Sequence, residues 1–221
     1  MSKYVFLSHI LKNDMPCYNG RNSIKIVQES SIEGGDSSNS VVVSLGNHVG
    51  THIDFPRHFF QNGKTINDYS PDYFVFNKVS VWNIPLDAGN CIDEEMLKSC
   101  KCAYGPDLLI IRTGYGRFYG KEKYWNDNPG LSFAAARYIK ETLPGLRALG
   151  LDFISINAYK NKQEGRKAHA ELLSYPEIMI IEDMNLHDLT DNVKKVIVAP
   201  LLISDADGAP CNVIAEVEIG L

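Results

Sequence analysis

The sequence has too few suitably spaced cysteines for a disulfide framework or a cysteine-based zinc site. Its five cysteines are an odd number, no two of them form a Cys-x-x-Cys pair, and no histidine lies close to any of them. Disulfide-rich secreted domains and zinc fingers depend on regular cysteine patterns. We therefore expect free thiols in a reducing compartment.

The sequence also lacks an apolar run of membrane-spanning length, and its first residues, MSKYVF, do not form the apolar core of a signal peptide. An excess of basic residues is absent as well, because the net charge is −5. A domain that binds nucleic acid would carry a basic patch. These absences predict a cytoplasmic protein that binds neither membranes nor nucleic acid.

Internal repeats, low-complexity tracts and obvious linkers are missing from the 221 residues, so we expect one domain over residues 1–221. Apolar residues make up 44% of the chain, which is enough to build a sizeable core. Domains of the α/β and β-rich classes often reach this length. The composition is that of one folded enzyme-sized domain.

Short β-branched segments bounded by Gly, Asn, Asp or Pro are typical of strands. The predicted strands are Tyr4–Ser8, Ile24–Gln28, Val41–Leu45, Val79–Ile84, Leu108–Arg112, Phe153–Ile156, Ile178–Ile181, Val196–Val198 and Val213–Val217. Helical spacing is rarer along the chain. Many strands with interspersed helices indicate an α/β or α+β fold with a mixed sheet and flanking helices.

Four segments are predicted to be helical. Asp93–Cys100 begins with acidic residues, which suit a helix N-terminus, and Ser132 can cap a helix over Phe133–Leu143. Pro144 can begin a short helix through Leu149, which Gly150 would end. Arg166–Ser174 is the fourth candidate.

The segment from Gly46 to Phe59 holds three of the six histidines, His48, His52 and His58, together with Asp54. In an extended chain, positions 48, 50, 52 and 54 share one face, and Gly50 would leave that face open. Three β-branched neighbours favour the extended form, and Pro56 makes a helix through this segment unfavourable. We interpret the segment as a strand end or loop that brings His48, His52 and Asp54 to one point.

Imidazole and carboxylate are the ligands that hold zinc, manganese or iron in an electrophilic state. The alternative is a hydrophobic strand with a few surface histidines. Three histidines and an aspartate within eleven residues favour the metal site over this alternative. Two further histidines, His9 and His187, fit no catalytic pattern and are expected to be structural.

The histidine-rich motif is similar to that of a known family. His48-Val-Gly-Thr-His52-Ile-Asp54-Phe-Pro-Arg-His58 resembles the His-x-Gly-Thr-His-x-Asp-x-Pro-x-His motif of the cyclase superfamily, which contains bacterial kynurenine formamidases and isatin hydrolases. Other segments resemble the family in the same order: Leu7-Ser8-His9, Met15-Pro16 and Tyr18-Asn19-Gly20, then His169 with Leu172-Leu173, Glu182 after Ile178–Ile181, and Asp207-Gly208-Ala209-Pro210. The resemblance spans essentially the whole chain.

This resemblance implies a swivelling β/β/α domain and a second pair of metal ligands, His169 and Glu182. From the residues alone, His169 reads as a solvated helix residue, and Glu182 either needs a cation after a buried strand or emerges into solvent. Asp54, with two carboxylate oxygens, is the natural ligand to share between two cations. The resemblance implies that His58 is catalytic. The alternative roles for His58 are a metal ligand or a surface histidine.

The implied activity is a metal-dependent hydrolase that cleaves an amide, formamide, lactam or lactone of a small, possibly aromatic substrate through metal-activated water. Two other functions stay open: a polyketide-type cyclase or dehydratase that uses the same metal as a Lewis acid, and a metal-binding scaffold without turnover. We expect one or two divalent ions, zinc first and manganese as the alternative. The resemblance also implies a homodimer or homotetramer.

Substrate identity is the least determined property. Phe55, Phe59 and Phe60 either line an aromatic pocket or pack in the core. Arg57, beside His58, either recognises a substrate carboxylate or faces solvent. Asn157 stands where an acidic residue is frequent in the family, which separates this chain from the usual formamidase pattern.

Overall fold

A mixed nine-stranded sheet forms the centre of the part of the chain that the structure describes, residues 1–20, 23–100, 102 and 105–218 of a computed structural model. The strand order is β5-β12-β13-β4-β11-β10-β8-β6, and β1 also pairs with β13. The strands are β1 (Ser2–Phe6), β4 (His52–Asp54), β5 (Val75–Phe76), β6 (Val79–Asn83), β8 (Leu108–Arg112), β10 (Ala148–Leu151), β11 (Met179–Glu182), β12 (Val193–Pro200) and β13 (Gly208–Glu218).

Smaller elements complete the chain. Two strand pairs lie apart from the central sheet, β2 (Ile24–Ser30) with β3 (Ser40–Leu45) and β7 (Cys91–Ile92) with β9 (Gly130–Leu131). The helices are α1 (Glu94–Lys98), α2 (Lys123–Asn126), α3 (Phe133–Thr142) and α4 (Lys162–Leu173). None of the described helices is long and apolar enough to cross a membrane.

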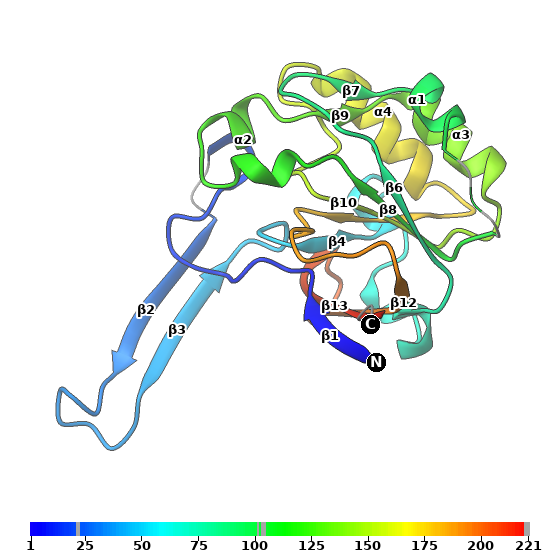
Figure 1. Cartoon of the computed structure of the whole chain (residues 1–221). Helices are drawn as coiled ribbons and strands as arrows, with labels where there is room; N and C mark the ends of the chain where they lie inside the picture. Colours follow the sequence, from blue (N-terminus) through cyan, green and yellow to red (C-terminus); the bar gives the residue numbers. More distant parts are fainter. Residues whose placement is uncertain (21–22, 101, 103–104, 219–221) are drawn as a thin grey trace.

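Figure 1 shows three layers: the helices, the strands from β4 to β6 in the sheet order, and the strands β1, β12 and β13. Strands β6, β8, β10 and β11 are parallel, and helices α1, α3 and α4 lie over them. Along β8, Leu109 and Ile111 pack against the helices, whereas Leu108 and Ile110 pack toward β12 and β13. This alternation follows from the two-residue period of a strand buried on both faces. The predicted α/β class with β/β/α layers is confirmed.

Most predicted strands and helices are present within a few residues of their expected limits. Ser132 caps α3 as predicted, because its Oγ accepts a hydrogen bond from the Ala135 amide at 3.0 Å. The prediction is wrong between residues 144 and 156. No helix begins at Pro144; instead β10 covers Ala148–Leu151, and the predicted strand Phe153–Ile156 is a buried loop.

Tertiary pairing explains this error. The β10 sequence, Ala-Leu-Gly-Leu, has little intrinsic preference for a strand, and its leucines and alanine suit a helix. The segment lies between two parallel strands, with Ala148 opposite Leu108 of β8 and Met179 of β11. All four residues are buried there. Pairing on both sides therefore decides the conformation that local composition left undecided.

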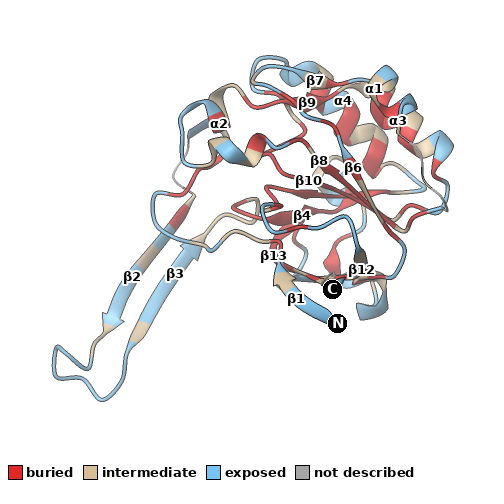
Figure 2. Ribbon diagram, in the orientation of Figure 1, coloured by how far each residue is buried: buried red, intermediate tan, exposed pale blue. Residues whose placement is uncertain are grey.

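The β2–β3 pair projects from the rest of the molecule as a long ribbon (Figure 1). Most of its residues are exposed, including Val27, Val41, Val42 and Val43 (Figure 2). At its base, Ile24 is buried in a small cluster with Met15, Cys17 and Val49. This cluster joins the ribbon to the segment that leads into β4.

Candidate metal centre

Strand β4 places two of the predicted ligands on one face. It pairs antiparallel with β11 on one side and β13 on the other, and His52 lies opposite Glu182 in the β11 register. His52 and Asp54 are two residues apart and point to the same side, while Ile53 between them is buried in the opposite core. The extended interpretation of this segment is correct for residues 52–54.

Four buried side chains converge here. His52 Nε2 lies 3.5 Å from both Asp54 Oδ1 and Glu182 Oε2. His169, which α4 supplies, has its Nε2 at 3.3 Å from Glu182 Oε1 and 3.7 Å from Asp54 Oδ2. All four side chains are at most 5% exposed. The structure therefore brings His52 and Asp54 together with the second predicted pair, His169 and Glu182, and these four residues form the inner half of the site.

His48 reaches the same carboxylate by a different route from the one expected. The strand begins only at His52, and the chain turns at Gly50, whose φ is +60°. This left-handed conformation favours glycine, and a Cβ here would also lie 2.8 Å from Leu11 Cδ2, so that side chain would have to move. The expectation that residues 48 and 50 share the strand face is wrong. His48 approaches from the loop, with Nδ1 at 2.8 Å from Asp54 Oδ1.

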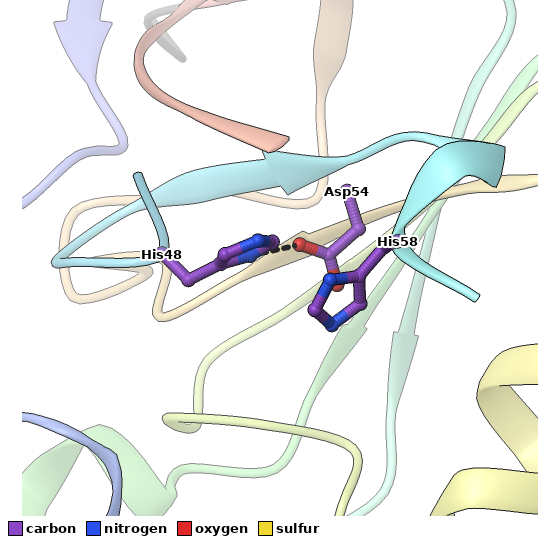
Figure 3. A group of neighbouring side chains, drawn as sticks. All are labelled: His48, Asp54 and His58. Carbon is purple, nitrogen blue, oxygen red and sulfur yellow. Dashed lines mark hydrogen bonds and ion pairs between the residues drawn. The ribbon is translucent and has the colours of Figure 1, made fainter. Parts of the chain in front are cut away.

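His58 occupies the outer side of the cluster. It ends the short 3₁₀ turn Pro56–His58, and its ring centroid is 4.2 Å from that of His48. Figure 3 shows His48 and His58 on either side of Asp54, with only His48 bonded to it. His58, Asp54 and His48 also offer one ligand atom each within 4.8 Å of one another. The geometry thus leaves His58 open to either a ligand role or a proton-transfer role.

Asp207 is a site residue that the sequence did not single out. Its Oδ2 lies 2.7 Å from His58 Nδ1 and 3.0 Å from His48 Nε2. It immediately precedes β13, in which Gly208 lies opposite Asp54. The only signal in the sequence was its place in the Asp207-Gly208-Ala209-Pro210 segment. His48, His58 and Asp207 form the outer half of the site. Because Asp207 binds Nε2 of His48 and Nδ1 of His58, it leaves the other nitrogen of each ring facing away from it.

Backbone carbonyls fix the inner histidines in the same way. His52 Nδ1 donates to the Gly50 carbonyl at 2.7 Å, and His169 Nδ1 donates to the Gly165 carbonyl at 2.9 Å. When these rings are neutral, their Nε2 atoms present lone pairs to the two carboxylates, which would repel them unless a proton or a metal cation lies between. Asp54 Oδ2 is buried and has no hydrogen-bond partner. These donor atoms fit a divalent cation.

The ionisation of these groups also shows that the cluster attracts positive charge. Burial lowers the pKa of His169, but the neighbouring carboxylates of Asp54 and Glu182 outweigh it and raise the pKa to about 10 when no metal is bound. Burial raises the pKa of Glu182, but hydrogen bonds from His169 and His52 bring it down to about 2. Either protons or a metal cation must balance the carboxylates, and a bound metal would replace the protons.

A cavity of about 290 Å³ opens beside the cluster. His52, Asp54, His169 and Glu182 lie on its wall, and so do His48 and His58. Glu182 Oε1 accepts hydrogen bonds from the Ile156 amide at 2.7 Å and from Ser155 Oγ at 3.1 Å. The buried loop that was predicted to be a strand therefore orients this carboxylate.

The three phenylalanines have different positions. Phe59 lines the cavity and stacks on His169, with centroids 4.9 Å apart and planes 12° apart. Phe55 is fully buried against Tyr69 and Phe74, and Phe60 is exposed and does not line the cavity. Of these three phenylalanines, Phe59 is the one that lines the cavity.

The remaining candidates lie outside the cavity. Arg57 is exposed, does not line the cavity, and donates a long hydrogen bond to the Gln61 carbonyl at 3.4 Å. His187 is on the surface, and His9 stacks on Tyr119. Of the two roles predicted for Arg57, the structure therefore agrees with the one in which it faces solvent.

Comparison with known proteins agrees with this arrangement. The family model described as "Putative cyclase" matches residues 5–158. A kynurenine formamidase of Bacillus thuringiensis subsp. konkukian (strain 97-27) is 28% identical over 218 residues, which cover 97% of this chain and 98% of that protein. Isatin hydrolase A from Labrenzia aggregata, bound to benzyl benzoate, has the same fold with a TM-score of 0.83 at 22% identity, over 98% of this chain and 94% of that one.

A predicted metal-dependent hydrolase from Bacillus stearothermophilus has a TM-score of 0.78 at 20% identity, with 98% of both chains covered. These structural likenesses extend over nearly the whole chain and establish the fold. The family model covers well over half of the 221 residues and includes the motif from His48 to His58. The chain belongs to the cyclase family.

Proposed function

We propose that this chain is a metal-dependent hydrolase that cleaves a C–N or C–O bond in an amide, formamide, lactam or lactone. The observation that carries the proposal is the inner cluster, in which the Nε2 lone pairs of His52 and His169 face Asp54 and Glu182. These four residues would hold a divalent cation, and His48 would be a further ligand through its contact with Asp54.

When bound, a divalent cation would supply an electrophilic centre that lowers the pKa of a coordinated water towards about 7. Residues of the chain would carry out the proton transfers. Asp207 accepts the Nδ1 proton of His58, which leaves Nε2 of that ring free to take a proton from the nucleophile. The same nitrogen can return the proton to the leaving nitrogen or oxygen as the bond to the carbonyl carbon breaks.

The relatives favour particular substrates. A kynurenine formamidase with 28% identity over nearly the whole chain supports a formamide on an aromatic amine. Phe59, stacked on His169 at the cavity wall, supports an aromatic group beside the reacting bond. Among the bonds above we therefore favour the C–N bond of an aryl formamide.

Two sets of three potential ligand atoms share Asp54: His52, Asp54 and Glu182, and His48, Asp54 and His58. This sharing supports one ion in the inner set and allows a second in the outer set. Zinc is the first expectation and manganese the second, because both accept imidazole and carboxylate ligands.

The test uses protein depleted of metal with a chelator and then supplied with zinc or manganese. Formanilide, isatin and an aromatic lactone are offered, and product masses are measured. Hydrolysis that needs metal and adds the mass of water supports the proposal. A product that has lost water supports the cyclase or dehydratase, and a protein that binds metal but turns over none of the substrates is a scaffold.

The expected homodimer or homotetramer and the cytoplasmic location remain predictions. The β2–β3 ribbon exposes several valines, and an interface between two copies of the chain would bury such an apolar surface. Light scattering of the purified protein measures the mass of the assembly.

A further inference from the structure

One arginine on the cavity wall has no hydrogen-bond or ion-pair partner among the residues that the structure describes. Arg166 lines the same cavity as His52, Asp54 and Glu182, and it is exposed, so it lies where the cavity meets solvent. It stands three residues before His169 on α4, which places both side chains on the same face of the helix.

The other arginines that the structure describes all have partners. Arg112, Arg117 and Arg147 donate to carboxylates and carbonyls, Arg137 pairs with Glu141, and Arg57 donates to Gln61. Arg166 has no hydrogen bond or ion pair with any described residue. A guanidinium with five donors and no acceptor beside it is available to an anion from outside the chain.

A second polar group without a partner faces the same space. The hydroxyl oxygen of Tyr18 is buried and has no hydrogen-bond partner among the described residues, and Tyr18 lines the cavity. Tyr18 and Arg166 line the same cavity, where one ligand would meet both groups. A buried hydroxyl without a partner is unfavourable, and a ligand that accepts its hydrogen bond removes that cost.

The helix that carries Arg166 is held close to the cavity wall. A Cβ on Gly165 would lie 2.4 Å from Asn157 Cα, so only glycine allows this approach. The Gly165 carbonyl also accepts the hydrogen bond of His169 Nδ1. The residue next to Arg166 therefore holds the His169 ring, so the positions of Arg166 and His169 depend on each other.

A second cation lies near Tyr18 at this end of the cavity, although the chain as a whole is acidic. Lys162, one turn before Arg166, lies with its Nζ 6.0 Å from the centre of the Tyr18 ring. Among the described residues it bonds to the neutral Asn19 Oδ1, at 3.1 Å, and contacts the Tyr159 ring. Two cations one turn apart on a chain of net charge −5 favour an anionic ligand at this end of the cavity.

We propose that Arg166, together with the Tyr18 hydroxyl, binds a carboxylate of the substrate at the outer end of the cavity. The inference rests on the proposed hydrolase function and narrows its substrate class to acids that carry the scissile amide or ester and a separate carboxylate. The guanidinium would bind both carboxylate oxygens, and Phe59 would contact the group between the two ends. Arg57, the candidate from the sequence, does not line this cavity.

The test compares formanilide with the three isomeric formamidobenzoates, which differ from it only by a carboxylate. Arg166→Met keeps the length and helix preference of the side chain without its charge. We expect this change to lower the ratio of kcat/KM for the best formamidobenzoate to that for formanilide at least about tenfold, mainly through KM. Arg166→Lys should recover part of the loss, and Arg57→Gln should leave the ratio unchanged.

A second readout does not depend on turnover. Benzoate binding to the metal-loaded protein is measured by calorimetry at low and high salt, and Arg166→Met should weaken it at least about tenfold at low salt. Equal benzoate affinity and an equal substrate ratio in Arg166→Met and the unaltered protein would overturn the inference. If the unaltered protein hydrolyses no substrate, the hydrolase proposal fails, whereas the benzoate comparison still decides the role of Arg166.

Discussion

The inner and outer halves of the site share Asp54 but differ in burial and in how their histidines are held. In the inner half, the side chains of His52, His169 and Glu182 are at most 5% exposed. In the outer half, His48 is 24% exposed, His58 29% and Asp207 36%. Backbone carbonyls fix the inner rings, whereas a carboxylate fixes the outer ones.

This difference suits two tasks. A cation that is held between carboxylates gains most where water is excluded, because the electrostatic attraction is screened least there. A group that exchanges protons during each turnover needs access to solvent and a stable orientation. Hydrogen bonds from His48 and His58 lower the pKa of Asp207, which keeps this carboxylate ionised as their common acceptor. The inner half is built to hold charge and the outer half to move protons.

The largest effect is expected at the residue that both halves share. Asp54→Asn removes the charge that His48, His52 and His169 face, so bound metal should fall below about 0.1 ion per chain. Hydrolysis should fall at least about a thousandfold. Metal content by mass spectrometry checks the first expectation, and His187→Ala on the exposed surface is the control. Full metal content in Asp54→Asn would refute the shared role.

His58→Gln separates the two halves. Because His58 is assigned to proton transfer, the variant should retain metal like the unaltered protein while kcat falls by about 10²–10⁴. Metal content and kcat are measured on the same preparation. Loss of metal together with activity would instead make His58 a ligand, which the cluster of His48, Asp54 and His58 also allows.

Asp207→Asn tests the support of the outer half alone. The amide keeps the shape of the side chain but loses the charge that orients His48 and His58. We expect metal to remain and kcat to fall by about 10–100-fold, as for other groups that orient ligands. A kcat equal to that of the unaltered protein would show that Asp207 has no part in catalysis.

The smallest of the four measured changes should be the effect of metal removal on thermal stability, which is separate from its effect on activity. A ligand at one hundred times its Kd stabilises the folded state by about 2.7 kcal/mol. For a chain of this length, that corresponds to a fall in Tm of about 5–10 °C on chelation. Scanning calorimetry with and without chelator measures the difference, and identical melting curves would argue against a cation in the buried inner half.

Local sequence patterns predicted the parts of the site that one strand or one helix supplies. The two-residue period brought His52 and Asp54 to one face, and Glu182 followed an apolar run that does form a buried strand. The turn at Gly50 was not predicted, because the two-residue period assumes an extended chain and Gly50 has a φ of +60°. His169 entered only through family resemblance, since the charged Arg166 and Lys167 shortly before it favoured a solvated helix residue.

The outer half was harder to predict because its parts are distant in sequence. Asp207 meets His48 and His58 only because β13 pairs with β4, and that pairing joins residues about 150 positions apart. Arg166 was missed for a related reason. Its place on the cavity wall depends on the approach of α4 to Asn157, which no periodicity along the chain reveals.

The central claim is that a cation in the inner half drives hydrolysis, and a titration tests it most directly. Protein stripped of metal is supplied with zinc in small steps while formanilide hydrolysis is followed. Activity should be absent at the start, rise in proportion to added zinc, and level off at one or two ions per chain. Full hydrolysis by protein that contains no metal would contradict the account.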